Sequence, residues 1–414
     1  MHSLFVLLLR HLQKKRFGCI IPSGKNWGEY MSFVKRLRNL TLKKVLRKAK
    51  RFLKKNVVMF VALIAAVVTC FFVPPDREYI EYFDTKTLSC LFITLAVVCA
   101  LRNIKFFTIL ARKLVLLTGT LRTLFLMLVC ITFLGSMLIA NDMALITFLP
   151  LSYFALSVTR KEKYMAYLFI LQNISANLGG MLTPFGNPQN LYLYSCYNIP
   201  TNEFCSIMLK PFLLAIALLC ICCLFVKNEK LTITEKFPEK LSIKRTVLYL
   251  LLFAVSLLVV FRIVPVIVGI VLITTVLIIV DREALLMVDY PLLLTFVFFF
   301  VFAGNLSRID AVREFFCVLL SWDTLIVSVL SCQFISNVPT AILLSQFTTD
   351  YQSLLVGVNI GGTGTLIASL ASLITFSEFK VLYPGHSKKY LLMFTVINFA
   401  FLIIMTVCSK LFFV

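Results

Sequence analysis

Two stretches of this sequence place glycine, asparagine and hydroxyl side chains inside long apolar segments. "NLGGMLTPFGNPQNL" (177–191) and "NIGGTGTLIASLASL" (359–373) align without gaps. The aligned pairs are Asn177 with Asn359, Gly179 with Gly361, Gly180 with Gly362, Thr183 with Thr365, Asn187 with Ser369, and Asn190 with Ser372. Such side chains, together with carbonyl groups freed by a helix break, can bind a small polar solute or a cation. The residue types therefore predict a binding site.

An asparagine in a broken hydrophobic block precedes each of these stretches. Asn141 lies in "LIANDMALITF" and Asn337 in "FISNVPTAILL". The same order occurs twice, which indicates an internal repeat. Asp142 is the only carboxylate that the sequence places near the membrane midplane, and Val338 takes the corresponding position. An ionisable residue at that depth marks an ion or proton pathway, so Asp142 is predicted to couple transport to a cation. Helix capping is its alternative role.

The predicted substrate and ion site draws on both halves of the chain. Its members are Asn141, Asp142, Asn177, Gly179, Gly180, Thr183, Asn187, Ser336, Asn337, Thr340, Asn359, Gly361, Gly362, Thr363, Thr365 and Ser369. Sodium is expected near Asn141, Asp142 and Asn177 and near Asn337 and Asn359, as a coupling ion, and no other cofactor is expected. The glycines could instead permit close helix packing, and Ser369 could bond to its own helix.

The composition requires a membrane environment for these stretches. With 60% apolar and 14% charged residues and a mean hydropathy of +0.94, the chain is predicted to be an all-α polytopic membrane protein. Full spans are expected at 56–73, 87–101, 164–190, 207–226, 247–261, 264–280, 291–303, 351–376 and 391–410. Two longer blocks, 123–158 and 321–345, are broken by polar residues and are interpreted as re-entrant hairpins.

The number of spans sets the relation between the two copies. Five crossings lie between the hairpins, so the hairpins enter from opposite sides and the repeat is inverted. The predicted parts are a basic segment (1–55), a first repeat (56–226), a linker (227–246) and a second repeat (247–414). Broken helices at matching positions of inverted repeats mark the midplane site of a secondary transporter. Irregular backbone is tolerated there only when it is buried in protein or lines a cavity.

The net charge of +22 is concentrated at the N-terminus. Residues 1–55 contain sixteen Lys and Arg against Glu29 alone. Apolar residues fall on one helical face between these bases, as in a helix lying on an anionic leaflet, here through residues 31–55. A solvated tail that enforces topology is an equal alternative. Basic loops place the N-terminus in the cytoplasm and the C-terminus outside a plasma or inner membrane, and nucleic acid is not expected as a partner.

Several chemistries lack the residues that they need. No Cys pair has zinc-ligand spacing with a nearby His, and "GVNIGGTG" has no Lys to reach a phosphate. The three His lie in predicted cytoplasmic segments, so no His proton relay crosses the membrane. Cys196 and Cys205 share an outside loop, where free thiols are expected. The chain is therefore not expected to be an enzyme. A membrane-embedded enzyme or a scaffold remains the non-transport alternative.

"ANDMALITFLPLS", "ANLGGMLTPFGNPQNLYLY", "SNVP" and "LLVGVNIGGTGTLIASLASLITF" resemble the ion transporter superfamily. It includes citrate-transporter-like proteins, divalent anion:sodium symporters and arsenite permeases. The resemblance covers about 56–410. It implies inverted halves with a hairpin from each side, sodium or proton coupling, a homodimer, and an elevator-like movement of the hairpin-bearing part.

The chain departs from the dicarboxylate symporters at both hairpin tips. These symporters have Ser-Asn-Thr there, whereas this chain has Ala-Asn-Asp at 140–142 and Ser-Asn-Val at 336–338. The expected function is secondary active transport of a small, anionic, carboxylate-type solute coupled to sodium or protons. The lack of Lys or Arg deep in any span leaves an arsenite-type metalloid efflux permease or a cation/proton antiporter as alternatives.

Overall fold

A computed structural model describes residues 52–53, 56–231 and 241–413. Contacts divide the chain into a unit of residues 1–57 and a unit of residues 58–414, and the second unit is described below. The predicted membrane-surface helix within 1–55, apart from Phe52 and Leu53, lies outside the described residues, as does the middle of the predicted linker.

The described residues form helices joined by short turns, which confirms the predicted all-α membrane protein. The α-helices are α3 (Val57–Cys70), α4 (Thr85–Asn103), α5 (Phe106–Val115), α6 (Leu121–Ile139), α7 (Asn141–Val158), α8 (Met165–Gly179), α9 (Pro188–Cys196), α10 (Thr201–Leu224), α11 (Ile243–Val260), α12 (Val266–Val280), α13 (Arg282–Leu286), α14 (Tyr290–Ser307), α15 (Asp310–Trp322), α16 (Thr324–Ile335), α17 (Asn337–Leu344), α18 (Tyr351–Ile360), α19 (Leu370–Leu382) and α20 (Ser387–Phe412). Short 3-10 helices are η1 (Arg77–Ile80), η2 (Glu162–Tyr164), η3 (Gly180–Leu182) and η4 (Pro384–His386). Seven described helices are long and apolar enough to cross a membrane, or eight with the bent pair α15 and α16.

Aspartates define where several of these helices begin. Asp84, Asp281, Asp289, Asp323 and Asp350 each precede a helix and accept a hydrogen bond from a backbone N–H three residues later. Such capping satisfies one of the N–H groups that the first helical turn leaves free. It also accounts for the acidic loop "DREALLMVD", whose two outer aspartates cap α13 and α14.

The first hairpin, α6 with α7, begins and ends at the same side of the protein. The Leu121 N–H donates to the Glu229 carbonyl over 2.8 Å, and Arg122 Nε donates to the Val226 carbonyl over 3.0 Å. Beyond the other arm, the Lys161 ammonium pairs with the Glu229 carboxylate and lowers its pKa. Each arm, at about 27 to 28 Å, is long enough to cross a membrane. Both arms return to the end of α10, which two antiparallel full spans would do as well, so the interpretation of 123–158 as a re-entrant hairpin stays a prediction.

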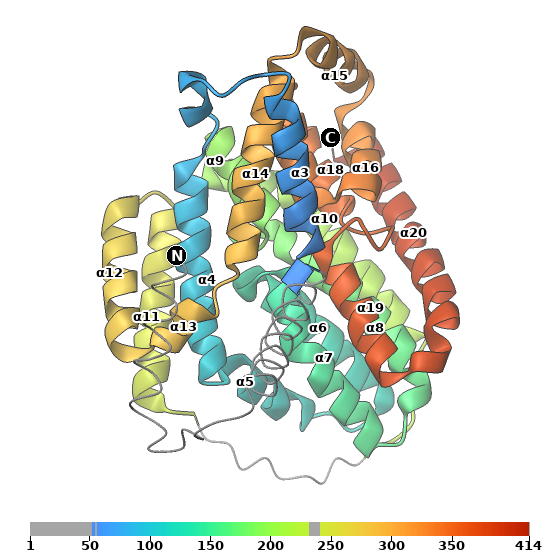
Figure 1. Ribbon diagram of the computed structural model, residues 1–414. Helices are drawn as coiled ribbons and strands as arrows, with labels where there is room; N and C mark the ends of the chain where they lie inside the picture. Colours follow the sequence, from blue (N-terminus) through green and yellow to red (C-terminus); the bar gives the residue numbers. More distant parts are fainter. Residues whose placement is uncertain (1–51, 54–55, 232–240, 414) are drawn as a thin grey trace, which may run out of the picture. The chain divides into compact units, whose positions relative to one another are not determined.

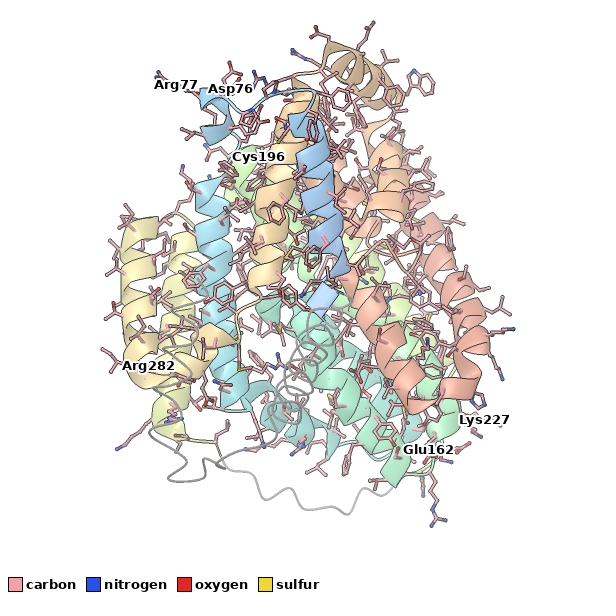
Figure 2. The ribbon with its side chains drawn as sticks, viewed as in Figure 1. Asp76, Arg77, Glu162, Cys196, Lys227 and Arg282 are labelled. Atoms are coloured by element: carbon pink, nitrogen blue, oxygen red, sulfur yellow. The ribbon has the colours of Figure 1, made fainter. Side chains whose placement is uncertain are left out.

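The second hairpin, α16 with α17, opens at the other end of α10. Tyr197, just after α9, donates to the Thr348 carbonyl over 2.8 Å, and Tyr351 donates to the Glu203 carboxylate in the first turn of α10. We call this end the opposite side and the end at 226–231 the linker side. Figure 1 shows α15 and α16 at the top and α5 and α7 at the bottom. Figure 2 places Cys196 at the top and Glu162 and Lys227 at the bottom.

The two predicted spans that contain the aligned motifs are interrupted. Residues 164–190 correspond to α8, η3 and the start of α9, with a break before Pro188. Residues 351–376 correspond to α18 and the first half of α19. The hairpins differ in length, since α6 and α7 have 19 and 18 residues whereas α16 and α17 have 12 and 8. Their opposite orientation is what an inverted repeat requires, and the division at 56–226 and 247–414 stays a prediction.

Candidate functional site

The two hairpin tips have the same unusual backbone. Ala140 has φ 60° and ψ 153°, and Ser336 has φ 73° and ψ 159°. Residues other than glycine rarely adopt this conformation, which costs about 1–3 kcal/mol and persists where the surrounding structure enforces it. At each tip the asparagine that follows accepts a hydrogen bond from the next backbone N–H, with Oδ1 to N distances of 2.9 Å at Asn141 and at Asn337. The two predicted tips are therefore local structural equivalents.

Side-chain amides satisfy the carbonyl groups freed by the helix breaks. In the first broken span, Asn190 Nδ2 donates to the carbonyls of Gly180, Met181 and Thr183 over 3.1 to 3.2 Å. In the second, Gln333 Nε2, from hairpin arm α16, lies 2.9 Å from the Gly361 carbonyl. These bonds let irregular backbone exist in a region without water. The Thr183 carbonyl also accepts from the Gly186 N–H and is saturated, whereas the carbonyls of Gly180, Met181 and Gly361 have a second lone pair for a cation or a solute donor.

Four buried asparagines join the two halves, and we call them the central amide cluster: Asn141, Asn177, Asn187 and Asn359. Asn141 Nδ2 lies 3.4 Å from Asn177 Oδ1, which connects the first tip to the first broken span. Asn187 Nδ2 lies 3.4 Å from the Asn177 carbonyl and 3.3 Å from Asn359 Oδ1. Exposure of the four ranges from 1% to 6%. One hydrogen-bond network thus contains predicted site residues from both halves.

The network includes residues that the sequence prediction missed. Asn173 Nδ2 lies 3.3 Å from Ser372 Oγ and 3.4 Å from Asn398 Oδ1, and the Asn173 carbonyl accepts from Asn177. Gln189 and Asn190 both bond to Asn359. Asn173 precedes Asn177 by one helical turn, and this spacing on one face of α8 was the available signal. No motif or spacing in the sequence around Asn398 marked it as a member of the network.

The predicted hydroxyl ligands make mainly backbone hydrogen bonds. Each threonine hydroxyl donates to a carbonyl group: Thr183 to Met137, Thr340 to Ser336, Thr363 to Ile360 and Thr365 to Gln333. Ser369 Oγ instead accepts from the Ser372 N–H. Ser369 therefore caps α19, whereas Asn187, in the equivalent position before α9, makes no capping bond with its side chain. These groups shape the site, and their contact with a solute stays a prediction.

The four predicted site glycines lie in different surroundings. A Cβ atom on Gly179 would lie 2.1 Å from the Phe133 carbonyl oxygen, and one on Gly361 would lie 2.7 Å from Cys332 Cβ. A Cβ on Gly180 would lie 2.5 Å from Asn187 Oδ1. These three positions allow close packing. A Cβ on Gly362 would be 3.1 Å from Asn337 Nδ2 and 3.6 Å from Asn177 Oδ1, so Gly362 lies between amides of the two halves.

Asp142 lies at a small cavity that the first tip helps to line. The walls come from α4, the tip itself, the start of α9 and the start of α14, which contributes Asp289. Asp142 Oδ1 is buried and has no hydrogen-bond partner within the described part of the chain. Asp142 was predicted to be the only carboxylate near the midplane, and the structure corrects this because the turn after α13 brings Asp289 to the same cavity.

The donor set at Asp142 suits a proton or a hard monovalent cation, since it combines carboxylate and amide oxygens. At the second tip, Asn337 Oδ1 and Asn359 Oδ1 already accept hydrogen bonds. Within residues 52–53, 56–231 and 241–413, no three His, Cys, Asp or Glu side chains come close enough to hold a metal ion. The two predicted sodium positions are therefore chemically unequal. The first has the unpartnered carboxylate oxygen of Asp142, whereas the unpartnered oxygens beside Asn359, Asn187 Oδ1 and Gln189 Oε1, belong to neutral amides.

The central amide cluster contains only neutral side chains, and the starts of four helices beside it supply positive electrostatic potential. The half-helices α7, α9, α17 and α19 begin at or beside the tips and breaks, at Asn141, Pro188, Asn337 and Leu370. The first N–H groups of a helix carry a partial positive charge that favours anions. The arrangement can thus bind an anion at the helix starts and a cation or proton at Asp142.

Comparison with known proteins gives concordant results. The family model described as citrate transporter matches residues 45–354, which include both tips and the first broken span. An uncharacterized transporter of Methanocaldococcus jannaschii is 33% identical over 367 residues, covering 86% of this chain and 98% of that protein. An inner membrane protein of Escherichia coli is 28% identical over 322 residues, covering 75% of this chain and 85% of that protein. Together with the paired tips and broken spans, these matches show that the chain belongs to the citrate transporter family of membrane transporters.

Proposed function

We propose that the protein is a secondary active transporter that moves a small carboxylate-type anion coupled to sodium or protons. The observation that carries the proposal is the central amide cluster, a buried polar network that joins one hairpin tip and both broken spans. A scaffold has no need for such a network at membrane depth, where polar groups are costly. The citrate transporter family supports a carboxylate as the solute class.

In this proposal the helix starts bind the anion and Asp142 binds the coupling ion. A cation or proton at Asp142 would compensate part of the negative charge that the solute brings, so the two bind together. The elevator-like movement, the homodimer, the lipid contact through 31–55 and the cytoplasmic N-terminus belong to the same proposal. Bases at the linker side, such as Arg112 and Lys113, support a cytoplasmic linker side.

A second candidate is a cation/proton antiporter, which the pairing of Asp142 with Asp289 on one cavity favours. Two carboxylates that share a cavity can exchange a proton for a cation without an organic solute. An arsenite-type permease for a neutral metalloid hydroxide would also fit a cluster without Lys or Arg. Measurement of solute uptake separates these alternatives.

The experiment is uptake of labelled citrate and shorter dicarboxylates into proteoliposomes under sodium or proton gradients. Asn177→Ala and Asn359→Ala should each lower uptake about five- to 150-fold, because each leaves a buried partner unpaired and costs about 1–3 kcal/mol of binding. Asn202→Ala, at an exposed position in the first turn of α10, is the matched control and should transport normally. Size-exclusion profiles establish folding. Normal uptake by both cluster variants would refute the site.

A further inference from the structure

A second and larger cavity, of about 330 Å³, lies beside hairpin arm α7. One wall consists of Ile146, Thr147, Pro150 and Leu151 of that arm. The other wall contains three bases, Arg102, Lys105 and Arg112, and none of its described lining residues is acidic. The cavity is therefore apolar on the hairpin side and cationic on the side of α4 and α5.

A tight turn between α4 and α5 gathers the bases. α4 ends at Asn103 and α5 begins at Phe106, and Lys105 between them has the left-handed φ of 56°. The chain changes direction within the two residues between the helices, so the last turn of α4 and the first turns of α5 border the same space. Bases dispersed over eleven sequence positions thereby act on one cavity.

The basic cavity and the Asp142 cavity lie one helical turn apart along both α4 and α7, and we call the two cavities together the groove. Leu95 and Val98 of α4 line the Asp142 cavity, and Arg102, one turn later on the same face, lines the basic cavity. On α7, Met143 lines the first cavity and Thr147, one turn later, lines the second. Arg102 Nη1 lies 3.4 Å from Met143 Sδ, and this contact separates the two cavities.

We propose that this groove is the route by which the anion passes between the linker side and the central amide cluster, with Arg102 as the residue that selects and admits it. A thioether is a weak acceptor, so a carboxylate would displace Met143 and form a charge-assisted, bidentate pair with the guanidinium group. Apolar walls of low dielectric strengthen the attraction of the Arg102 guanidinium group for an anion. The inference rests on the proposed function and assigns the specificity for anions to a residue outside the cluster.

The test measures charge selectivity in the groove without transport. Thr147→Cys is treated with two methanethiosulfonate reagents of similar size, one anionic and one cationic, and modification of residue 147 is followed by peptide mass spectrometry so that native cysteines do not interfere. The anionic reagent should react faster relative to the cationic one, and Arg102→Gln should lower this rate ratio about two- to tenfold. Arg102→Lys keeps the charge and should keep the ratio.

Lys113→Gln is the matched control, since Lys113 is an exposed base on α5 that does not line the cavity. It should leave the rate ratio unchanged. If Thr147→Cys resists both reagents, or if Arg102→Gln and Lys113→Gln give the same ratio as the parent, the groove is not an anion route. If the ratio responds as expected and no carboxylate is transported, the groove stands and the proposed solute class fails. With transport present, Arg102→Gln should raise KM for the anion more than it lowers kcat.

Discussion

A glycine-to-alanine series separates close helix packing from a role in the site. Gly179→Ala and Gly362→Ala each add one methyl group, the first in the first repeat and the second in the second repeat, but the surroundings of the two positions differ. At Gly179 the new carbon would lie 2.1 Å from the Phe133 backbone oxygen and 2.5 Å from Ser136 Oγ. At Gly362 the nearest atom would be Asn337 Nδ2, at 3.1 Å. Gly385, with nothing within 4 Å, provides the control position.

The distances set the expected magnitudes. A carbon placed 2.1 Å from a backbone oxygen forces α6 and α8 apart, so Gly179→Ala should lower the free energy of unfolding by about 1–3 kcal/mol or more. For a chain of 414 residues this corresponds to a melting temperature lower by roughly 1–3 °C. At Gly362 the nearest atom belongs to a side-chain amide that can shift by a few tenths of an ångström, and the Asn359 backbone oxygen at 3.3 Å is only slightly tight, so the stability cost should stay below about 1 kcal/mol. The methyl group would still occupy space between Asn337 and Asn177.

The assay combines thermal unfolding in detergent with uptake by proteoliposomes. Gly362→Ala should melt like Gly385→Ala and yet lose at least about tenfold in uptake, because solute or ion needs the space between the two amides. Gly179→Ala should melt earlier. Uptake by Gly362→Ala at the parental rate and affinity would show that these amides do not border the transport site. A Gly179→Ala protein as stable as Gly385→Ala would refute the close contact of α6 with α8.

Two further predictions concern coupling and topology. Asp142→Asn should fold normally, because Asn has nearly the same shape as Asp and no side chain caps the start of α7. It should lose sodium or pH dependence together with concentrative uptake, measured with and without gradients. Unchanged ion dependence would show that Asp142 does not bind the coupling ion. In intact cells an impermeant thiol reagent should modify the exposed Cys196 faster than the half-buried Cys205, both of which are free thiols, and should not modify Lys227→Cys. Modification of residue 227 from outside would reverse the proposed orientation.

The paired motifs could be predicted from the sequence because they depend on local chemistry. Gly-Gly and Pro residues interrupt a helix wherever they occur, and an asparagine after a break can cap the next half-helix. The positions of both tips and both breaks therefore followed from the sequence. Hydropathy alone is less informative about crossings, since α6 and α7 are each long and apolar enough to span. The contacts of Leu121 and Lys161 with Glu229 place both ends of this hairpin on one side, and they hold equally for two full spans and for a re-entrant hairpin.

The sequence by itself determined the membrane setting, the repeated order of tip and break, and the asparagines that form the central amide cluster. Tertiary structure decided which groups meet: Asn187 with Asn359, 172 residues away; Asp289 at the cavity of Asp142; and Arg102 against Met143. The physical reason is the range of each effect. Apolarity, helix breaking and capping act within one or two helical turns, whereas a pair of buried polar groups forms only after helices distant in the chain have packed and excluded every other partner.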